Sequence, residues 1–313
     1  MWIDIVGILL GLIGCGISVF IALRQDRQLA QLTLIEKDTS ETAHKIAADD
    51  YKRDVVKKFF FAGKEPSKFK CLFPAEYCSK PLPSILAGDY YALHVLQELL
   101  AGDQLDLRPQ SSCDNAGGDS LDGDLIFLCT PHANPALSRL AKPLELMPDP
   151  QECPVPWFDD IELPCWFAND IAPEFGGEKI KKIWVRETGD RLPSPSETEY
   201  HRSPVNGKKH VPLSDVQADY AILLRLSGTR RVIVIAGIHQ YGTWIAGEFL
   251  RRLAIKDDKN KSIQPREKDL LLQDHDFLAI VWGHFRTSTL AVEQLGIHHN
   301  YIWIRTDTGW QLA

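Results

Sequence analysis

The chain has 313 residues, enough for one large or two modest domains with a sizeable core. Its formal net charge of -7, without an offsetting basic stripe, argues against binding of a nucleic-acid duplex. The seven cysteines are scattered, with neither CxxC nor Cys/His zinc spacing. The sequence therefore supports no disulfide framework and no metal site, and we expect no cofactor.

Residues 5–23 form an apolar run without a charge that is long enough to cross a bilayer. We therefore predict a transmembrane helix over residues 1–23. Asp4 precedes the run and Arg24 and Arg27 follow it, so the positive-inside rule places the N-terminus outside and the rest of the chain in the cytoplasm. The alternative is a buried core helix at the N-terminus.

Small residues recur at four-residue steps in this helix. Gly7 and Gly11 lie on one stripe, and Gly14 and Ser18 lie on another. Such spacing lets helices approach closely in lipid, so we expect the chain to form a homo-oligomer, and two stripes suit a ring of more than two copies.

Residues 24–62 are polar and helix-prone, which predicts a juxtamembrane helical stalk. Residues 63–313 then predict an α/β domain with a mixed sheet. Early strands are expected at Phe69–Phe73 and Leu105–Leu107, with an amphipathic helix from Gly88 between them. Asp89 suits the N-cap of that helix.

A buried strand, Asp124–Cys129, runs into a polar turn at a helix start. Asn134 suits the N-cap and Pro135 the first helical position, which explains both structurally. The functional alternative is that Thr130, His132 and Asn134 line a ligand pocket, because ligands bind at the carboxyl ends of strands in open α/β sheets.

A second uncharged strand, Val232–Ile235, precedes a turn bracketed by Gly237 and Gly242, with His239 between them and a helix from Thr243. Strand, glycine-rich turn and helix start together favour an anion site. The alternative is that the glycines only permit a tight turn. If Gly242 contributes to such a site, we expect a change to valine to abolish ligand binding and leave the fold mostly intact.

Residues 141–215 predict an irregular excursion, rich in proline and with tryptophans among acidic residues. Short strands are expected within it at Cys165–Phe167 and Ile183–Val185. Beyond it, Asp219–Leu226 and Arg231–Ala236 predict a hairpin, and the C-terminal strands look antiparallel.

The sequence lacks the motifs of several common nucleotide-binding sites. The 237–243 turn has no P-loop lysine, and no strand is followed by G-x-G-x-x-G. A nucleophile and base could be formed by Cys129 and His239, with Asp219 assisting, but a thiol ending an apolar strand is usually buried and inert. We expect a binding role more than a catalytic one.

The layout of transmembrane helix, stalk and α/β domain with the 130–134 and 237–243 turns resembles membrane-anchored effectors of bacterial antiphage systems. In these, a Rossmann-like domain of CARF, SAVED, SLOG or TIR-related type senses a nucleotide-derived messenger. The resemblance implies an inner-membrane protein that assembles on ligand binding and perturbs the bilayer. On that basis Thr243 and the turn amides would hold phosphate, and His239, Thr130 and Asn134 would contact base or ribose.

Two other hypotheses remain open from the sequence. One is a membrane-tethered enzyme acting on a nucleotide or related metabolite, with His239 as acid/base. The other is a membrane-anchored interaction module that presents the tryptophan-rich segment 151–190 to a protein partner. An exposed aromatic patch would favour the latter.

Overall fold

The computed structural model describes residues 37, 41–75, 85–100, 104–110, 121–131, 133–142, 156–172, 178–193, 216–256, 263–286 and 288–313. The chain divides into two compact units, Met1–Tyr51 and Lys52–Ala313. The described residues of the first unit are helical, and the helix over residues 41–61 continues into the second unit. The α/β fold lies in the second unit.

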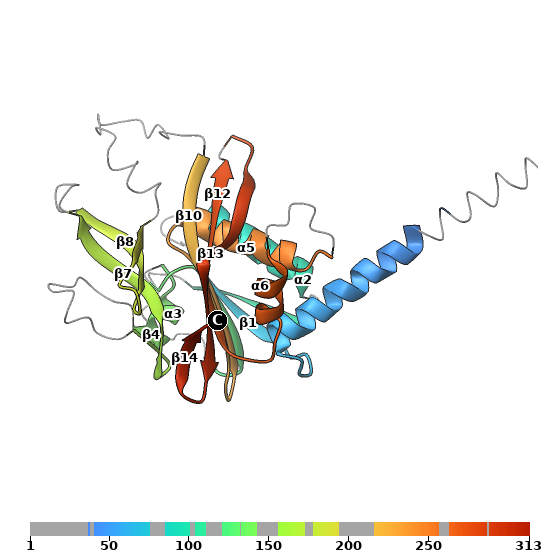
Figure 1. The fold of residues 1–313 in the computed structure, drawn as a ribbon, viewed down its shortest axis with the longest axis horizontal. Coiled ribbons are helices and arrows are strands. Elements are labelled where there is room, and N and C mark those ends of the chain that lie inside the picture. The colour runs from blue at the N-terminus through green and yellow to red at the C-terminus, as the bar shows by residue number, and fades with distance from the viewer. Residues whose placement is uncertain are drawn as a thin grey trace, which may run out of the picture. The chain divides into compact units, whose positions relative to one another are not determined.

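An eight-stranded sheet is the centre of this unit, with the order β14-β13-β12-β10-β11-β3-β1-β2 (Figure 1). The half containing β2, β1, β3 and β11 is parallel, and β11 then pairs antiparallel with β10, which begins the antiparallel half. The prediction of a mixed-sheet α/β domain is therefore confirmed. The strands are β1 (Phe69–Pro74), β2 (Leu105–Gln110), β3 (Asp124–Leu128), β10 (Val216–Ser227), β11 (Arg231–Gly237), β12 (Phe277–Arg286), β13 (Ala291–Thr306) and β14 (Gly309–Leu312).

Two helices cover the first face of the sheet, α2 (Ala87–Leu99) and α5 (Gln240–Leu253). They cross closely, because a Cβ on Gly247 would lie 3.0 Å from Cα of Ala92. The rings of Tyr91 and Trp244 stack at 4.5 Å between them. A shorter helix, α6 (Pro265–Leu271), precedes β12 and begins with a capping box between Gln264 and Glu267.

The second face of the sheet is covered by α3 (Pro135–Leu140) and two small antiparallel sheets. Alternate residues of β11, such as Val232 and Val234, pack in one cluster with Leu137 of α3 and with Trp166 and Ile183. The small sheets are β4 (Ala141–Lys142), β5 (Trp157–Phe158) and β6 (Ile161–Glu162), and β7 (Cys165–Ala172), β8 (Glu178–Val185) and β9 (Arg191–Pro193). The expectation of an irregular excursion is thus corrected for its described residues, whereas the two short strands expected there are present.

The helix over residues 41–61 ends inside the core of the second unit. Phe59, Phe60 and Phe61 are almost fully buried, and the ring of Phe59 lies 5.5 Å from that of Phe277. Ala62 and Gly63 then adopt left-handed backbone conformations, and Gly63 N–H donates to Lys57 O, so the helix stops.

Among the described residues, no helix combines the length and apolarity that a bilayer span requires. The predicted span over residues 5–23, with Gly7, Gly11, Gly14 and Ser18, lies outside the described residues.

Candidate functional site

The two polar turns singled out in the sequence lie side by side, because their strands β3 and β11 are parallel neighbours. Cys129 N–H donates to Ile235 O at 3.0 Å, which holds the strand ends together. After β3 the chain leaves to α3 on the second face, whereas after β11 it leaves to α5 on the first face. This divergence creates a topological switch point, the place where open α/β sheets bind ligands.

The backbone of the turn between β11 and α5 is hydrogen-bonded to the carboxylate of Asp219 in β10. Oδ2 of Asp219 accepts from His239 N–H at 3.2 Å and from Gly242 N–H at 2.7 Å. Asp219 therefore occupies the position at the helix start that the sequence suggested for phosphate. Its pKa is raised because burial outweighs the nearby His239 charge and these amide hydrogen bonds.

The other predicted residues of this turn also contact the protein itself. The hydroxyl of Thr243, fully buried, accepts from Gly237 N–H at 3.2 Å. A Cβ on Gly237 would lie 2.1 Å from Thr243 N, and one on Gly242 would lie 2.3 Å from Tyr220 O. Both glycines are needed for close backbone packing, so the expectation that Gly242→Val leaves the fold mostly intact is wrong. His239 stays partly exposed at the N-cap of α5, without a side-chain capping bond.

In the turn after β3, Asn134 has a structural role and Thr130 does not share it. Asn134 is fully buried, accepts from the N–H groups of Ala136 and Leu137, and donates to Leu72 O and Leu128 O. Thr130 is 2% exposed, and its hydroxyl makes no hydrogen bond of ordinary geometry to the described residues, although it interacts with the Cys129 thiol. His132, the third residue predicted here, lies outside the described residues.

Asp89 lies near the same two turns, although the sequence alone predicts only a capping role for it. That expectation is corrected: Leu86 is the N-cap of α2, and Asp89 lies in the first turn of the helix with 0% exposure. The N-terminus of α2 packs closely against the N-terminus of α5, since a Cβ on Gly88 would lie 1.7 Å from Gln240 O. This contact directs the Asp89 carboxylate toward Thr243 and Cys129.

The Asp89 carboxylate has few hydrogen-bond partners. Neither oxygen has a hydrogen bond of ordinary geometry to the described residues. Burial raises the pKa of Asp89 to about 6, against weaker opposing interactions with the Thr243 hydroxyl and the Cys129 thiol. A buried carboxyl group in this state is a common mark of a functional site. The signal in the sequence was an acidic residue in a helix start that is otherwise apolar.

Cys129 lacks the environment of a nucleophile. Its pKa is raised to about 12, mainly by burial and next by the Asp89 charge, so the thiol stays neutral near pH 7. Its backbone has a φ of 73°, an uncommon value for a residue other than glycine, and this turn brings Thr130 beside it. A cation, Lys181 of β8, also acts on the thiol from the second face.

The aromatic rings of the excursion are core residues where the structure describes them. Phe158, Trp166 and Phe167 are at most 1% exposed, and Trp184 is 8% exposed. Trp157 is the exception, with 37% exposure. The described part of segment 151–190 thus offers no continuous exposed aromatic patch of the kind that favours the interaction hypothesis.

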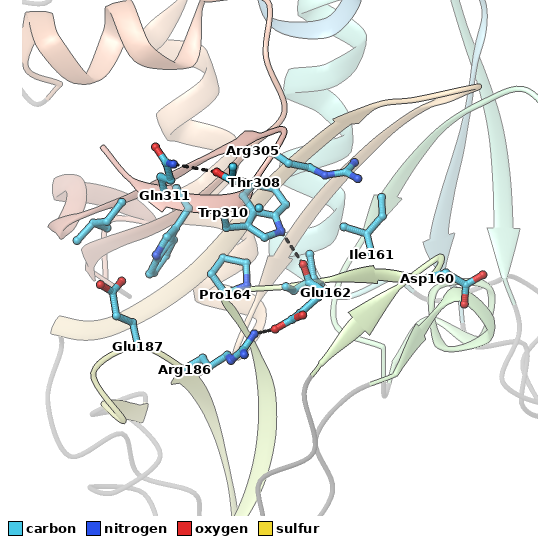
Figure 2. A pocket seen from close by; sticks show the side chains of 14 residues that line it. Asp160, Ile161, Glu162, Pro164, Arg186, Glu187, Arg305, Thr308, Trp310 and Gln311 are labelled. Carbon is cyan, nitrogen blue, oxygen red and sulfur yellow. Dashed lines mark hydrogen bonds and ion pairs between the residues drawn. The ribbon is translucent and has the colours of Figure 1, made fainter.

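A groove of about 820 Å³ lies between β6, the turn after β8 and the β13–β14 hairpin (Figure 2). It is lined at one end of the sheet by Trp303 and Arg305 of β13, close to Asp276, which precedes β12. The starts of the parallel strands lie at this end, so the groove is remote from the β3 and β11 turns. None of the ligand-site residues predicted from the sequence lines it, whereas residues 160–164, 186 and 187 of segment 151–190 do.

In the described part of the chain, no three His, Cys, Asp or Glu side chains come together to hold a metal ion. Comparisons with protein-family models, with curated proteins and with solved structures found no match.

Proposed function

We propose that the chain is a single-pass membrane sensor-effector whose α/β domain binds a nucleotide-derived signal at the carboxyl end of β3. The observation that supports this most is the pair of buried, unsatisfied polar side chains, Asp89 and Thr130, at the switch point of the sheet. The four parallel strands and their helices support the proposal that this is a Rossmann-like domain.

The chemistry of the site favours a ligand that brings hydrogen-bond donors. A carboxylate accepts hydrogen bonds from ribose hydroxyls or an amino group, and a threonine hydroxyl both donates and accepts. Phosphate is disfavoured beside Asp89 and Asp219, since like charges repel at close range. A phosphate of the ligand would instead lie toward Lys181, the cation on the second face.

The signal would be relayed from the ligand site to the stalk through strand β10, which contacts both. Asp219 holds the turn before α5, and Arg225, six residues further along the strand, donates to Lys58 O at 2.8 Å and to Phe59 O at 3.1 Å. These carbonyls end the helix that continues from the predicted stalk. Movement at the turn would thereby reach the stalk and the residues 5–23, where Gly7, Gly11, Gly14 and Ser18 would pack between copies.

In this proposal the protein lies in a bacterial inner membrane with its C-terminal domain in the cytoplasm. The layout of anchor, stalk and sensing domain favours a role in antiphage defence, in which the assembled helices perturb the membrane. The neutral, buried thiol of Cys129 makes the enzymatic alternative weaker.

The test is thermal unfolding of the full-length chain in detergent with NAD, ADP-ribose and cyclic mono-, di- and oligonucleotides. A ligand that binds only the folded state raises the melting temperature. The stabilising compound is then recovered and checked for chemical change. A shift with intact ligand supports a sensor, a shift with consumed ligand supports an enzyme, and no shift with any compound contradicts the proposal.

A further inference from the structure

The groove in Figure 2 lies between two strand edges. β14 is the last strand of the eight-stranded sheet, and β6 is the last strand of a small sheet. The indole N–H of Trp310 donates across the groove to Glu162 O at 2.5 Å and connects its two walls. The groove therefore runs beside a sheet edge, where a further strand can be added.

The backbone of β14 has pairing groups on its outer side. In the antiparallel ladder, Trp310 is opposite Arg305 and Leu312 is opposite Trp303. Arg305 N–H donates to Asp276 O, away from β14, while Ile302 O accepts from Ala313 N–H. Because bonding alternates along a strand, the N–H and C=O groups of Trp310 and Leu312 point outward.

The side chains around the groove combine an apolar floor with an acidic rim. Leu163 and Trp303 are buried, and Pro164 lies beside them. Two cations on the rim are already paired: Arg186 with Glu162, and Arg305 with Asp276 at 3.3 Å.

Two exposed carboxylates remain on the rim. Asp160 and Glu187 line the groove, and neither has an ion pair with another described residue. The unpaired charge of the groove is thus negative.

We propose that this groove binds an extended peptide of a protein partner, with apolar residues in its centre and basic residues at its ends, as an additional strand on β14. Backbone bonds to Trp310 and Leu312 would provide the affinity. Apolar side chains in the centre of the peptide would enter the groove, and lysine or arginine side chains at its ends would meet Asp160 and Glu187, which lie at opposite ends of the groove (Figure 2). This site is separate from the ligand site at β3, so either can exist without the other.

The test uses a short fluorescein-labelled peptide with a valine-rich centre and lysines at both ends, titrated onto the full-length chain in detergent. A valine/glutamate peptide is the control for charge. We expect saturable binding of the first peptide alone. Binding should weaken at least about tenfold in an Asp160→Lys, Glu187→Lys variant, whose changes are at exposed positions.

Strand pairing is tested separately by Leu312→Pro. This change removes an outward N–H and no bond to β13, and Leu312→Ala retains that N–H as the matched control. We expect loss of peptide binding in the proline variant alone, and slower hydrogen exchange at the Trp310 and Leu312 amides in the complex. Unchanged affinity of the proline variant, equal binding of the glutamate peptide, or no saturable binding would each overturn the proposal.

Discussion

At the scale of single residues, the candidate site is defined by buried polar side chains whose hydrogen-bonding groups have no ordinary partner in the described residues. Asp89 and Thr130 are buried without ordinary hydrogen bonds to the described residues, whereas the Asn134 side chain makes four, to its own turn and to β1. A buried polar group without a partner calls for an explanation, and the explanation that we propose here is a bound ligand. This contrast separates the residues that bind ligand in our proposal from those that form the turn.

The Asp89 charge should destabilise the fold above its folded pKa. Burial raises that pKa from 3.8 to about 6, so between these values the folded chain holds a proton that the unfolded chain releases. Stability should therefore fall as pH rises through this window, by about 3 kcal/mol for this group. We expect Asp89→Asn to increase the free energy of unfolding at pH 7.5 and to have a smaller effect at pH 4.5. Equal effects at both pH values, measured by urea unfolding, would rule out this origin.

Gly242 should be required for the fold and not only for ligand binding. A Cβ there would lie 2.3 Å from Tyr220 O and 2.8 Å from Cα of Gly237, so neighbouring backbone has to move. We expect Gly242→Ala to lower the free energy of unfolding by about 3 kcal/mol. The control is Gly228→Ala, where nothing lies within 4 Å and the change should be within about 0.5 kcal/mol. Equal stabilities of the two variants in urea would disprove the packing role.

At the scale of elements, β10 connects the β11–α5 turn to the helix that ends at Phe61. Arg225, 1% exposed, lies over the ring of Phe277 and donates to carbonyls of both that helix and the segment before β12. Its positive charge also lies where a helix end favours a cation. A buried charge is kept here because its hydrogen bonds are made to four carbonyl groups.

Replacing Arg225 by methionine should leave those carbonyls without their donor. We expect a loss of about 3 kcal/mol or more in the free energy of unfolding, with a smaller loss for Arg225→Lys, whose ammonium cannot reach all four groups. Exposed Arg266 on α6 provides the control, with an expected change within about 0.5 kcal/mol for Arg266→Met. Guanidinium unfolding measures all three. A neutral Arg225→Met would show that the helix end is held by its phenylalanines alone.

The sequence predicted the elements whose pattern is local. Uncharged runs of residues predict strands β3 and β11, and Gly228 predicts the hairpin between β10 and β11. Asn134 and Pro135 predict the start of α3. The small sheets were missed in part because strands of two residues, such as β5, carry no periodicity and depend on partners distant in the chain.

The site was predicted less completely for a similar reason. The β3 and β11 turns meet because their strands are neighbours in the sheet, and no local pattern in the sequence determines that strand order. The role of Asp89 depends on the contact between α2 and α5, and that of Asp219 on pairing between β10 and β11. Neither contact produces a local sequence pattern, so the sequence alone predicts a cap at Asp89 and a catalytic role for Asp219.

At the scale of the whole molecule, the proposal joins a sensing domain to a membrane segment. The apolar, uncharged residues 5–23 carry the membrane part of this proposal. We expect the full-length chain to stay with the membrane fraction through a high-salt wash, and a chain lacking residues 1–23 to be released from it. Fractionation with immunodetection checks this, and release of the full-length chain by salt alone would contradict a transmembrane anchor.

The most direct measurement is the ligand-induced shift of the melting temperature in three full-length proteins: wild type, Asp89→Asn and Asp269→Asn, the last altering an exposed carboxylate on α6. Each is compared with and without the compound that stabilises the wild type, at pH 7.5. We expect the shift to persist in Asp269→Asn and to disappear in Asp89→Asn, because the carboxylate accepts the ligand's donors. An equal shift in all three would place the ligand elsewhere and contradict a nucleotide site at the end of β3.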